Sequence, residues 1–191
     1  WGEVKLYIAG KLKSFSLAVF TLPFSNYRFA YLYESETIVC VQDAHVKCIG
    51  HLGFIPNVFT YDNMRTVVKN FIGNERTITD SMKNLSMHYH FQIRLCQPRK
   101  GNEKGHVERS VEYIRRKAFA HRDTFTTLEE AISYLTGTVE KLNHRKHYLK
   151  VKTHVELMLE EKAERQNSVK VAPYDPAELV ELRVDKYSTV T

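Results

Sequence analysis

The stretch from residue 98 to residue 116 holds the residues best suited to chemistry in this chain. Its first part is predicted to be a loop, because Pro98 and two glycines interrupt regular structure there. From His106 onward, apolar residues recur at positions i, i+4, i+7 and i+11, which predicts a helix with one buried stripe. Glu108 falls in the first turn of that helix. The stripe consists of Val107, Val111, Ile114 and Ala118.

A carboxylate surrounded by cations is what a metal-dependent phosphoryl-transfer site requires. The carboxylate oxygens hold a divalent ion, and the cationic side chains hold the phosphates. A simpler interpretation stays open at this point. The segment is then a solvated amphipathic helix, and Glu108 is favoured near its N-terminus by the helix dipole.

Basic charge is concentrated around this carboxylate. The window from residue 91 to residue 122 contains nine lysines and arginines against three glutamates, an excess equal to the net charge of +6 of the whole chain. Such focusing favours a polyanionic partner over an ordinary solvated face. The basic residues are Arg94, Arg99, Lys100, Lys104, Arg109, Arg115, Arg116, Lys117 and Arg122, and the acids are Glu103, Glu108 and Glu112.

The composition indicates a globular protein with one substantial core. Hydrophobic residues make up 43% of the chain and charged residues 26%. No apolar run approaches the ~20 residues of a membrane-spanning helix. The three cysteines form no C-x-x-C pair, so we expect reduced thiols in a cytoplasm rather than a zinc cluster.

The order of the predicted elements indicates an α/β fold. Three strands in succession imply an antiparallel meander, and a helix then leads to a fourth strand. Mixed sheets flanked by helices in this order are the plan of the RNase H-like fold. Strands are expected near 4–8, 13–22, 27–33, 56–61 and 91–96, helices over 36–50, 63–70, 79–88, 126–144 and 153–167, a loop over 73–76, and the start of a C-terminal β module over 178–191.

A second candidate carboxylate, Asp62, stands at the end of the predicted strand 56–61. In open α/β sheets, ligand-binding groups gather at the carboxyl ends of strands. Asp62 could also cap a helix beginning near Met64, and both roles can hold together. His45, on the predicted helix 36–50, is more simply a packed or surface histidine than a metal ligand.

Three motifs carry a resemblance to a known family. W-G-E at residues 1–3, Y-D-N at 61–63 and K-G-H-V-E-R at 104–109 resemble the DDE transposases and retroviral-type integrases. The IstA-type insertion-sequence transposases are the most similar. The likeness is specific up to about Arg122 and looser up to the P-Y-D-P sequence at 173–176.

The resemblance implies the roles of particular residues. Asp62 is the second catalytic carboxylate and Glu108 the third, and their side chains are expected within ~8 Å of each other, around two Mg²⁺ or Mn²⁺ ions. In that family the first aspartate lies immediately before W-G-E. It would therefore precede Trp1, and a polypeptide of these 191 residues alone is expected to be inactive. The residues expected to contact DNA phosphates are Lys100, Lys104, Arg109, Arg115 and Arg116.

Other acidic and polar residues were weighed for the same site. Glu103 could replace Glu108, but it lies between two glycines, where its orientation would be poorly fixed. Glu112 lies one turn after Glu108 and suits a supporting role around the metal ligands. Asn63 is expected to support Asp62 rather than to bind metal.

These inferences favour the catalytic core of a DNA transposase that cleaves transposon ends and joins their 3′-hydroxyls to target DNA. The alternative is a catalytically inactive RNase H-like domain that binds DNA or protein, and ribonuclease H proper is less favoured. The resemblance also implies a homo-oligomer on DNA and an AAA+ ATPase helper. We expect a core over 1–122, a helical extension over 123–169, and a linker with the start of a β module over 170–191.

Overall fold

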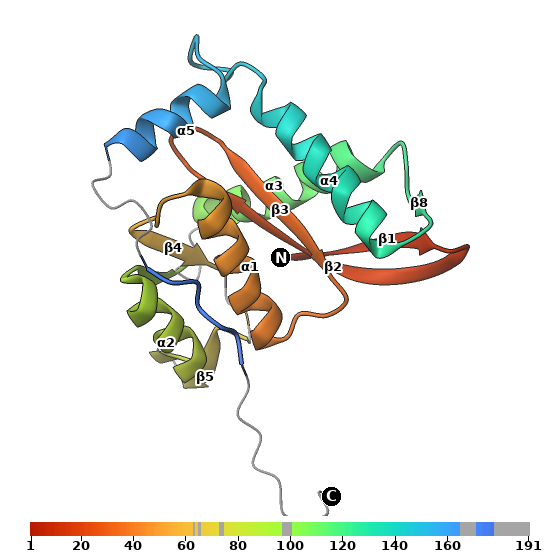
Figure 1. The fold of residues 1–191 in the computed structure, drawn as a ribbon. Helices are drawn as coiled ribbons and strands as arrows, with labels where there is room; N and C mark the ends of the chain where they lie inside the picture. The colour runs from red at the N-terminus through yellow and green to blue at the C-terminus, as the bar shows by residue number, and fades with distance from the viewer. Residues whose placement is uncertain (63, 65, 73–74, 97–100, 165–170, 178–191) are drawn as a thin grey trace, which may run out of the picture.

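A computed structural model describes residues 1–62, 64, 66–72, 75–96, 101–164 and 171–177, and for residues 70–72, 75–76 and 101–108 it describes the backbone alone. Strands and helices follow the predicted α/β order (Figure 1). The elements are β1 (Gly2–Ile8), β2 (Lys11–Thr21), β3 (Arg28–Tyr33), α1 (Ile38–Leu52), β4 (Val58–Tyr61), β5 (Val68–Ile72), β6 (Glu75–Ile78), α2 (Asp80–Tyr89), β7 (Gln92–Leu95), α3 (Gly101–Phe119), β8 (Thr124–Phe125), α4 (Leu128–Asn143) and α5 (His154–Ala163).

The first three strands form the expected antiparallel meander. A two-residue turn joins β1 to β2, and both Ala9 and Gly10 have positive φ there, 50° and 77°. This is the type I′ geometry that matches the twist of paired strands, and it suits glycine at the second position. Burial alternates along β1, as expected for a strand with one face in the core. The second strand, β2, confirms the strand predicted near 13–22, although it begins two residues earlier, at Lys11.

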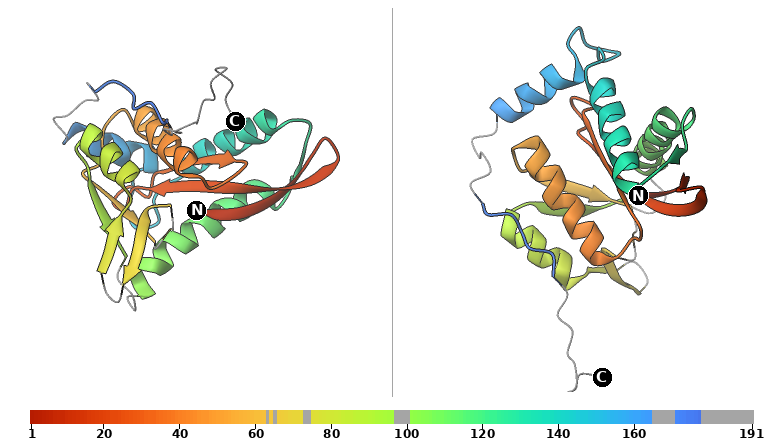
Figure 2. Two further views of the ribbon diagram at one scale, coloured as in Figure 1. Left: turned by 90° about the horizontal axis from the view of Figure 1, so that it is seen from below. Right: turned by 45° about the vertical axis from the view of Figure 1, so that its right-hand side comes forward.

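The main sheet has the order β3-β2-β1-β8, with β8 parallel to β1, so the sheet is mixed as predicted. Helices α3 and α4 pack against one face, where Leu6, Leu17 and Leu32 meet Ile114 and Leu135. The alternate residues of β2 and β3 face α1 on the other side, in a smaller cluster around Ala18 and Ala44. The two views in Figure 2 show the sheet, with the β1–β2 hairpin, between α1 on one side and α3 and α4 on the other.

A second group of elements lies at the end of the molecule opposite the tip of the β1–β2 hairpin (Figures 1 and 2). The parallel pair β4–β7 packs with α1 and α2 in a cluster rich in aromatic residues. The Gln42 side chain, 2% exposed, donates to the Ser81 carbonyl oxygen at 2.9 Å and ties α1 to α2. This group positions the carboxyl end of β4.

Helix α1 has clear stop and start signals. Thr37 caps it through a bond from the Cys40 N–H, and Gly53 ends it in the left-handed conformation with φ 68°. The helix predicted over 36–50 therefore continues to Leu52, and Gly50 lies inside it.

Several predicted boundaries are wrong. The helix expected over 63–70 is replaced from Val68 by strand β5, and part of the loop expected over 73–76 belongs to β6. These two strands pair with each other, and Val67 and Val68 are buried in the core beside α2. No helix begins at Met64, so Asp62 does not have the capping role.

Helix α3 also begins earlier than predicted. Residues 101–105 were expected in a loop, but they belong to the helix, which starts at Gly101. The predicted apolar stripe is buried where it is described, at Val111, Ile114 and Ala118. The predicted strand pair over 178–191 lies outside the described residues.

Candidate active site

Asp62 follows β4 directly and is half-buried. The preceding residue, Tyr61, has its carbonyl oxygen bonded to the Cys96 N–H at 2.9 Å, so the end of β4 is held to the end of β7. The Met64 N–H then donates to the Asp62 carbonyl oxygen at 2.6 Å, which turns the chain sharply after the carboxylate. Asp62 thus lies at the carboxyl end of an anchored strand, as predicted from the sequence.

The beginning of β1 lies at the same corner. The backbone nitrogen of Trp1 lies near the carboxylates of Glu36 and Asp62, which act on it electrostatically. The indole ring of Trp1 packs against the ring of Tyr33, with centroids 5.5 Å apart. Trp1 therefore lies within electrostatic reach of Asp62.

Helix α3 approaches this corner through Gly2. A Cβ atom on Gly2 would lie 2.6 Å from Cγ1 of Val111, closer than side chains tolerate, so only glycine allows this contact between β1 and α3. Glu108 precedes Val111 by three residues, about one helical turn. The backbone thus brings the turn that carries Glu108 to the start of β1. The side chain of Glu108 lies outside the described residues, so its distance from Asp62 stays a prediction.

This contact gives a first testable prediction. Gly2→Ala should lower the free energy of unfolding by about 1–3 kcal/mol, because the new methyl group pushes α3 away from β1. Chemical denaturation measures the change. Gly50→Ala is the matched control, since no atom lies within 4 Å of its added Cβ in α1 and alanine favours a helix there. Equal stability of Gly2→Ala and the parent protein would contradict the close approach.

Glu36 is a residue of this corner that the sequence analysis missed. It follows β3 and precedes the cap of α1, and partial desolvation raises the pKa of its carboxyl group. The strand register explains its place, because Glu3 of β1 and Tyr33 of β3 pair with the same residue, Ser16 of β2. The end of β3 therefore lies level with the start of β1.

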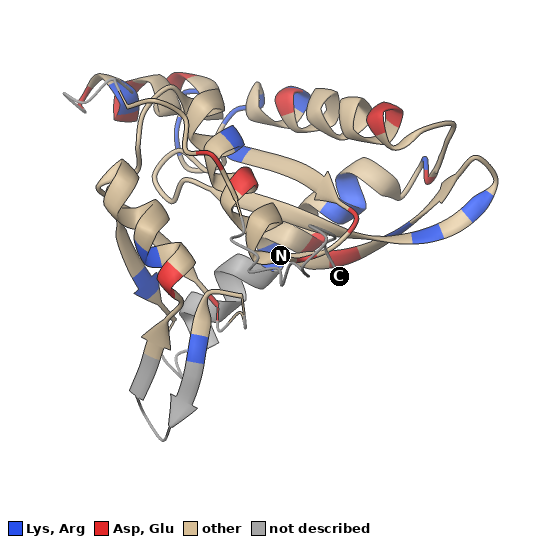
Figure 3. Ribbon diagram, turned by 60° about the horizontal axis from the view of Figure 1, so that its bottom comes forward, with Lys and Arg blue, Asp and Glu red and all other residues tan. Residues whose placement is uncertain are grey.

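The predicted DNA contacts on α3 are only partly described. Arg109, Arg115 and Arg116 are exposed, whereas the side chains of Lys100 and Lys104 lie outside the described residues. Arg115 forms an ion pair with Glu112 and also donates to the Glu3 carbonyl oxygen at 3.5 Å. Figure 3 marks lysines and arginines on the described part of α3 and along the β1–β2 hairpin. Glu112 therefore orients a cation beside the site. Asn63 lies outside the described residues.

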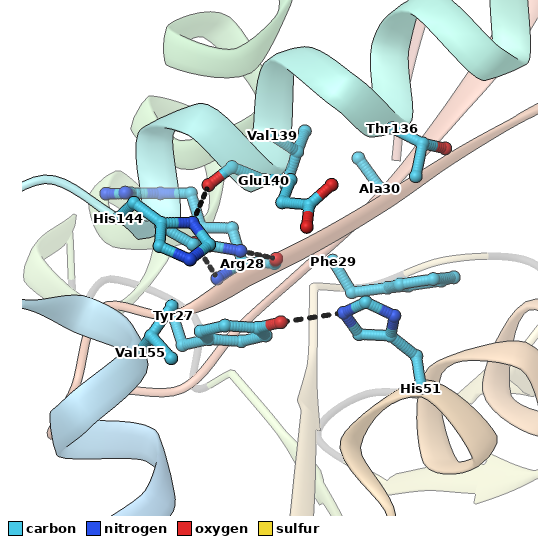
Figure 4. Close-up of a pocket in the computed structure, with 11 residues that line it drawn as sticks. Tyr27, Arg28, Phe29, Ala30, His51, Thr136, Val139, Glu140, His144 and Val155 are labelled. Atoms are coloured by element: carbon cyan, nitrogen blue, oxygen red, sulfur yellow. Dashed lines mark hydrogen bonds between the residues drawn. The ribbon is translucent and has the colours of Figure 1, made fainter.

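A separate pocket of about 290 Å³ lies between β3, α1 and α4. Tyr27 and His51 bond across it at 2.7 Å, and the His144 Nδ1–H donates to the Glu140 carbonyl oxygen at 2.9 Å (Figure 4). The Asn143 amide binds both backbone groups of Arg28, at 3.0 and 2.8 Å, and so holds α4 to the edge strand. None of the predicted site residues lines this pocket.

Among the residues with described side chains, no three His, Cys, Asp or Glu residues come together as a metal site. Glu108 is not in that set. No described helix is both long enough and apolar enough to cross a membrane.

The fold defines a class of protein. The catalytic core of the integrase of BIV superimposes with a TM-score of 0.59 at 16% sequence identity, covering 85% of this chain and 94% of that one. The HTLV-2 integrase catalytic core in complex with magnesium gives 0.59 and 16%, over 82% and 92% of the two chains. A chain of the simian T-cell lymphotropic virus intasome gives 0.63 and 15%, over 94% and 58%. The chain therefore has the RNase H-like fold of integrase catalytic cores.

Sequence similarity narrows this class. The transposase for insertion sequences IS1326/IS1353 of Pseudomonas aeruginosa is 30% identical over 131 residues, 68% of this chain and 26% of that protein. A transposase of Aminobacter aminovorans is 31% identical over 136 residues, 71% and 27%. The IS21 transposase of Pseudomonas aeruginosa is 27% identical over 135 residues, 69% and 35%. No protein-family model matches.

The chain thus has an integrase-like core fold and is similar in sequence to insertion-sequence transposases. It spans only about a quarter to a third of the length of these relatives.

Proposed function

We propose that this chain is the catalytic core of a DNA transposase, which cleaves transposon ends and joins their 3′-hydroxyls to target DNA by metal-dependent phosphoryl transfer. One observation carries the proposal. Asp62 at the end of β4, the start of β1, and the turn of α3 before Val111 converge on one corner of the fold. Three separate elements can thus contribute carboxylates to one site, as a polynucleotidyl transferase requires.

The donors available at this corner fit Mg²⁺ or Mn²⁺. Asp62 and Glu36 both act electrostatically on Trp1, and α3 carries Glu108 one turn before its contact with Gly2. Carboxylate oxygens are the hard ligands that Mg²⁺ prefers. A bound divalent ion supplies charge stabilisation to the attacking and leaving oxygens of the displacement. In this proposal Asp62 and Glu108 hold the metal, and the carboxylate of Glu36 adds negative charge beside it.

The exposed arginines of α3 would hold the DNA backbone beside this corner. Contacts from these side chains to phosphates would position the DNA without reading its base sequence. The ion pair of Arg115 with Glu112 keeps one guanidinium close to the start of β1. DNA binding by these residues is therefore expected to be weak, tolerant of sequence and sensitive to salt.

Salt dependence tests this surface. Arg116→Ala should reduce the slope of log K against log salt by about 1, because one phosphate contact and its released counterion are lost. A labelled duplex titrated at two or more salt concentrations measures the slope. Lys141→Ala, an exposed substitution on α4, is the matched control. An unchanged slope for both Arg115→Ala and Arg116→Ala would show that the described end of α3 does not contact DNA.

The experiment that tests the function extends the chain upstream. The resemblance puts the first aspartate just before Trp1, and the closeness of Asp62 to the backbone nitrogen of Trp1 supports that position. We expect a protein that includes an aspartate there and the upstream DNA-binding region to process and join transposon ends in Mg²⁺. A silent extended protein that binds DNA would favour the alternative, an inactive RNase H-like binding domain.

Further features belong to the same proposal. A homo-oligomer on DNA, an AAA+ ATPase helper and a cytoplasmic, nucleoid-associated location are expected from the resemblance. The division at residues 122 and 169 is also proposed, with α4 as an extension that packs directly on the main sheet through Leu135 and Val139.

A further inference from the structure

A buried histidine lies directly behind the candidate active site. His45, in the middle of α1, is 0% exposed and is enclosed by aromatic rings. Its ring stands nearly perpendicular to that of Phe20, at 4.9 Å, and stacks on that of Phe91, at 6.1 Å. A polar group in such surroundings is costly unless both of its nitrogens are paired.

The hydrogen bonds of His45 can be assigned to donors and acceptors. Nδ1 lies 2.6 Å from the Val41 carbonyl oxygen, which can only accept, so Nδ1 carries the proton. Nε2 therefore has a free lone pair, and the Tyr61 hydroxyl, 2.7 Å away, donates to it. Burial lowers the pKa of His45, so its imidazole stays neutral near pH 7 and Nε2 keeps its role as the acceptor of this bond.

Tyr61 is consequently held from two sides. Its hydroxyl is bound to α1 through His45, and its carbonyl oxygen is bound to the Cys96 N–H beyond β7. The next residue is Asp62, whose own carbonyl oxygen is bonded within the turn. Rotation of the Tyr61 ring or a shift of β4 along α1 would break the bond to His45 and move the carboxylate.

We infer that His45 is a positioning residue for metal binding, which fixes Tyr61 and through it the carboxylate of Asp62. This inference rests on the proposed function. A buried hydrogen-bonded pair can often be replaced by apolar groups of the same shape at little cost in stability. The pair therefore contributes one defined orientation of the carboxyl end of β4. Mutation of residues that hold metal ligands in place typically changes metal affinity by about 10- to 100-fold.

The fold provides a matched control at the other end of α1. The Tyr27 hydroxyl is hydrogen-bonded to Nε2 of His51 at 2.7 Å, a second tyrosine–histidine pair (Figure 4). It lies at the pocket between β3 and α4 rather than beside Asp62. Tyr27→Phe removes the same kind of bond without touching β4.

The experiment measures Mn²⁺ binding by electron paramagnetic resonance in the upstream-extended protein. Tyr61→Phe and the double variant His45→Phe/Tyr61→Phe should bind Mn²⁺ about 10-fold more weakly than the parent protein. Tyr27→Phe should bind it normally. The double variant should unfold within a few degrees of the parent protein, because no buried polar atom is left unpaired, so weaker binding in it cannot be ascribed to unfolding.

The outcomes separate the two ideas. If the parent protein binds Mn²⁺ no better than Asp62→Asn, the proposed function fails. If the parent protein binds Mn²⁺ through Asp62 and the double variant binds it equally well, the positioning role of His45 is wrong. Equal weakening by Tyr27→Phe would also overturn it, since the effect would then be a general loosening of α1.

Discussion

Asp62→Asn and Glu108→Gln should each abolish end cleavage and strand joining in the upstream-extended protein, by more than about 10³-fold. An amide keeps the shape of the side chain but removes the negative charge that holds the metal. Asp62 stands at the anchored end of β4 and Glu108 lies on the turn of α3 that reaches the start of β1. A gel assay that separates nicked from joined DNA measures both steps.

DNA binding is the internal control for these two variants. The exposed arginines of α3 are untouched, so affinity for a labelled duplex should stay close to that of the parent protein. Glu103→Gln should have little effect, and Glu112→Gln an intermediate effect at most, because Glu112 orients Arg115. Full activity of Glu108→Gln together with loss of activity in Glu103→Gln would show that the third carboxylate is misassigned.

The elements that position Asp62 could be predicted because they follow simple periods. β1 alternates buried and exposed residues, and α4 lies within the helix predicted over 126–144 and begins after Thr127, whose side chain accepts from the Glu130 N–H. The position of Asp62 directly after a predicted strand can also be recognised from the sequence. These signals are local, since each depends on residues only a few positions apart.

The errors fall where distant contacts decide the conformation. Residues 66–72 contain no strong turn or cap signal, and the chain forms β5 because it pairs with β6 and buries Val67 and Val68 against Met82. The early start of α3 was missed because Asn102, Glu103 and Lys104 carry no apolar period. Two glycines in that turn cost about 1 kcal/mol each relative to alanine, which packing of the rest of the helix can offset.

Glu36 illustrates why a site cannot be completed from sequence alone. Nothing near residue 36 marks it, since an acid before a helix is ordinary. Its relation to Trp1 and Asp62 depends on the register of three strands, which sets the end of β3 level with the start of β1. The close contact between Gly2 of β1 and Val111 of α3 also cannot be predicted from the sequence, because the two residues meet only in the folded structure.

The second large effect concerns stability below neutral pH. Burial lowers the pKa of His45 from 6.5 to about 4, whereas the unfolded chain titrates near 6.5. Between these values the unfolded state binds more protons than the folded state, so lowering the pH favours unfolding. The contribution of His45 is fully present above about pH 7 and is lost as the pH falls towards 4. The expected loss is about 3 kcal/mol.

Urea unfolding at pH 7.5, 6.0, 5.0 and 4.5 measures this loss. The reference is His45→Phe/Tyr61→Phe, which keeps the aromatic packing around α1 and contains the same carboxylates and other histidines as the parent protein. The difference in unfolding free energy between the two proteins isolates His45, and the parent protein should lose about 3 kcal/mol relative to the variant between pH 7.5 and 4.5. Parallel curves would mean that His45 takes up its proton without leaving the bond to Tyr61 or the aromatic cluster. The bond that orients β4 would then not depend on a neutral imidazole.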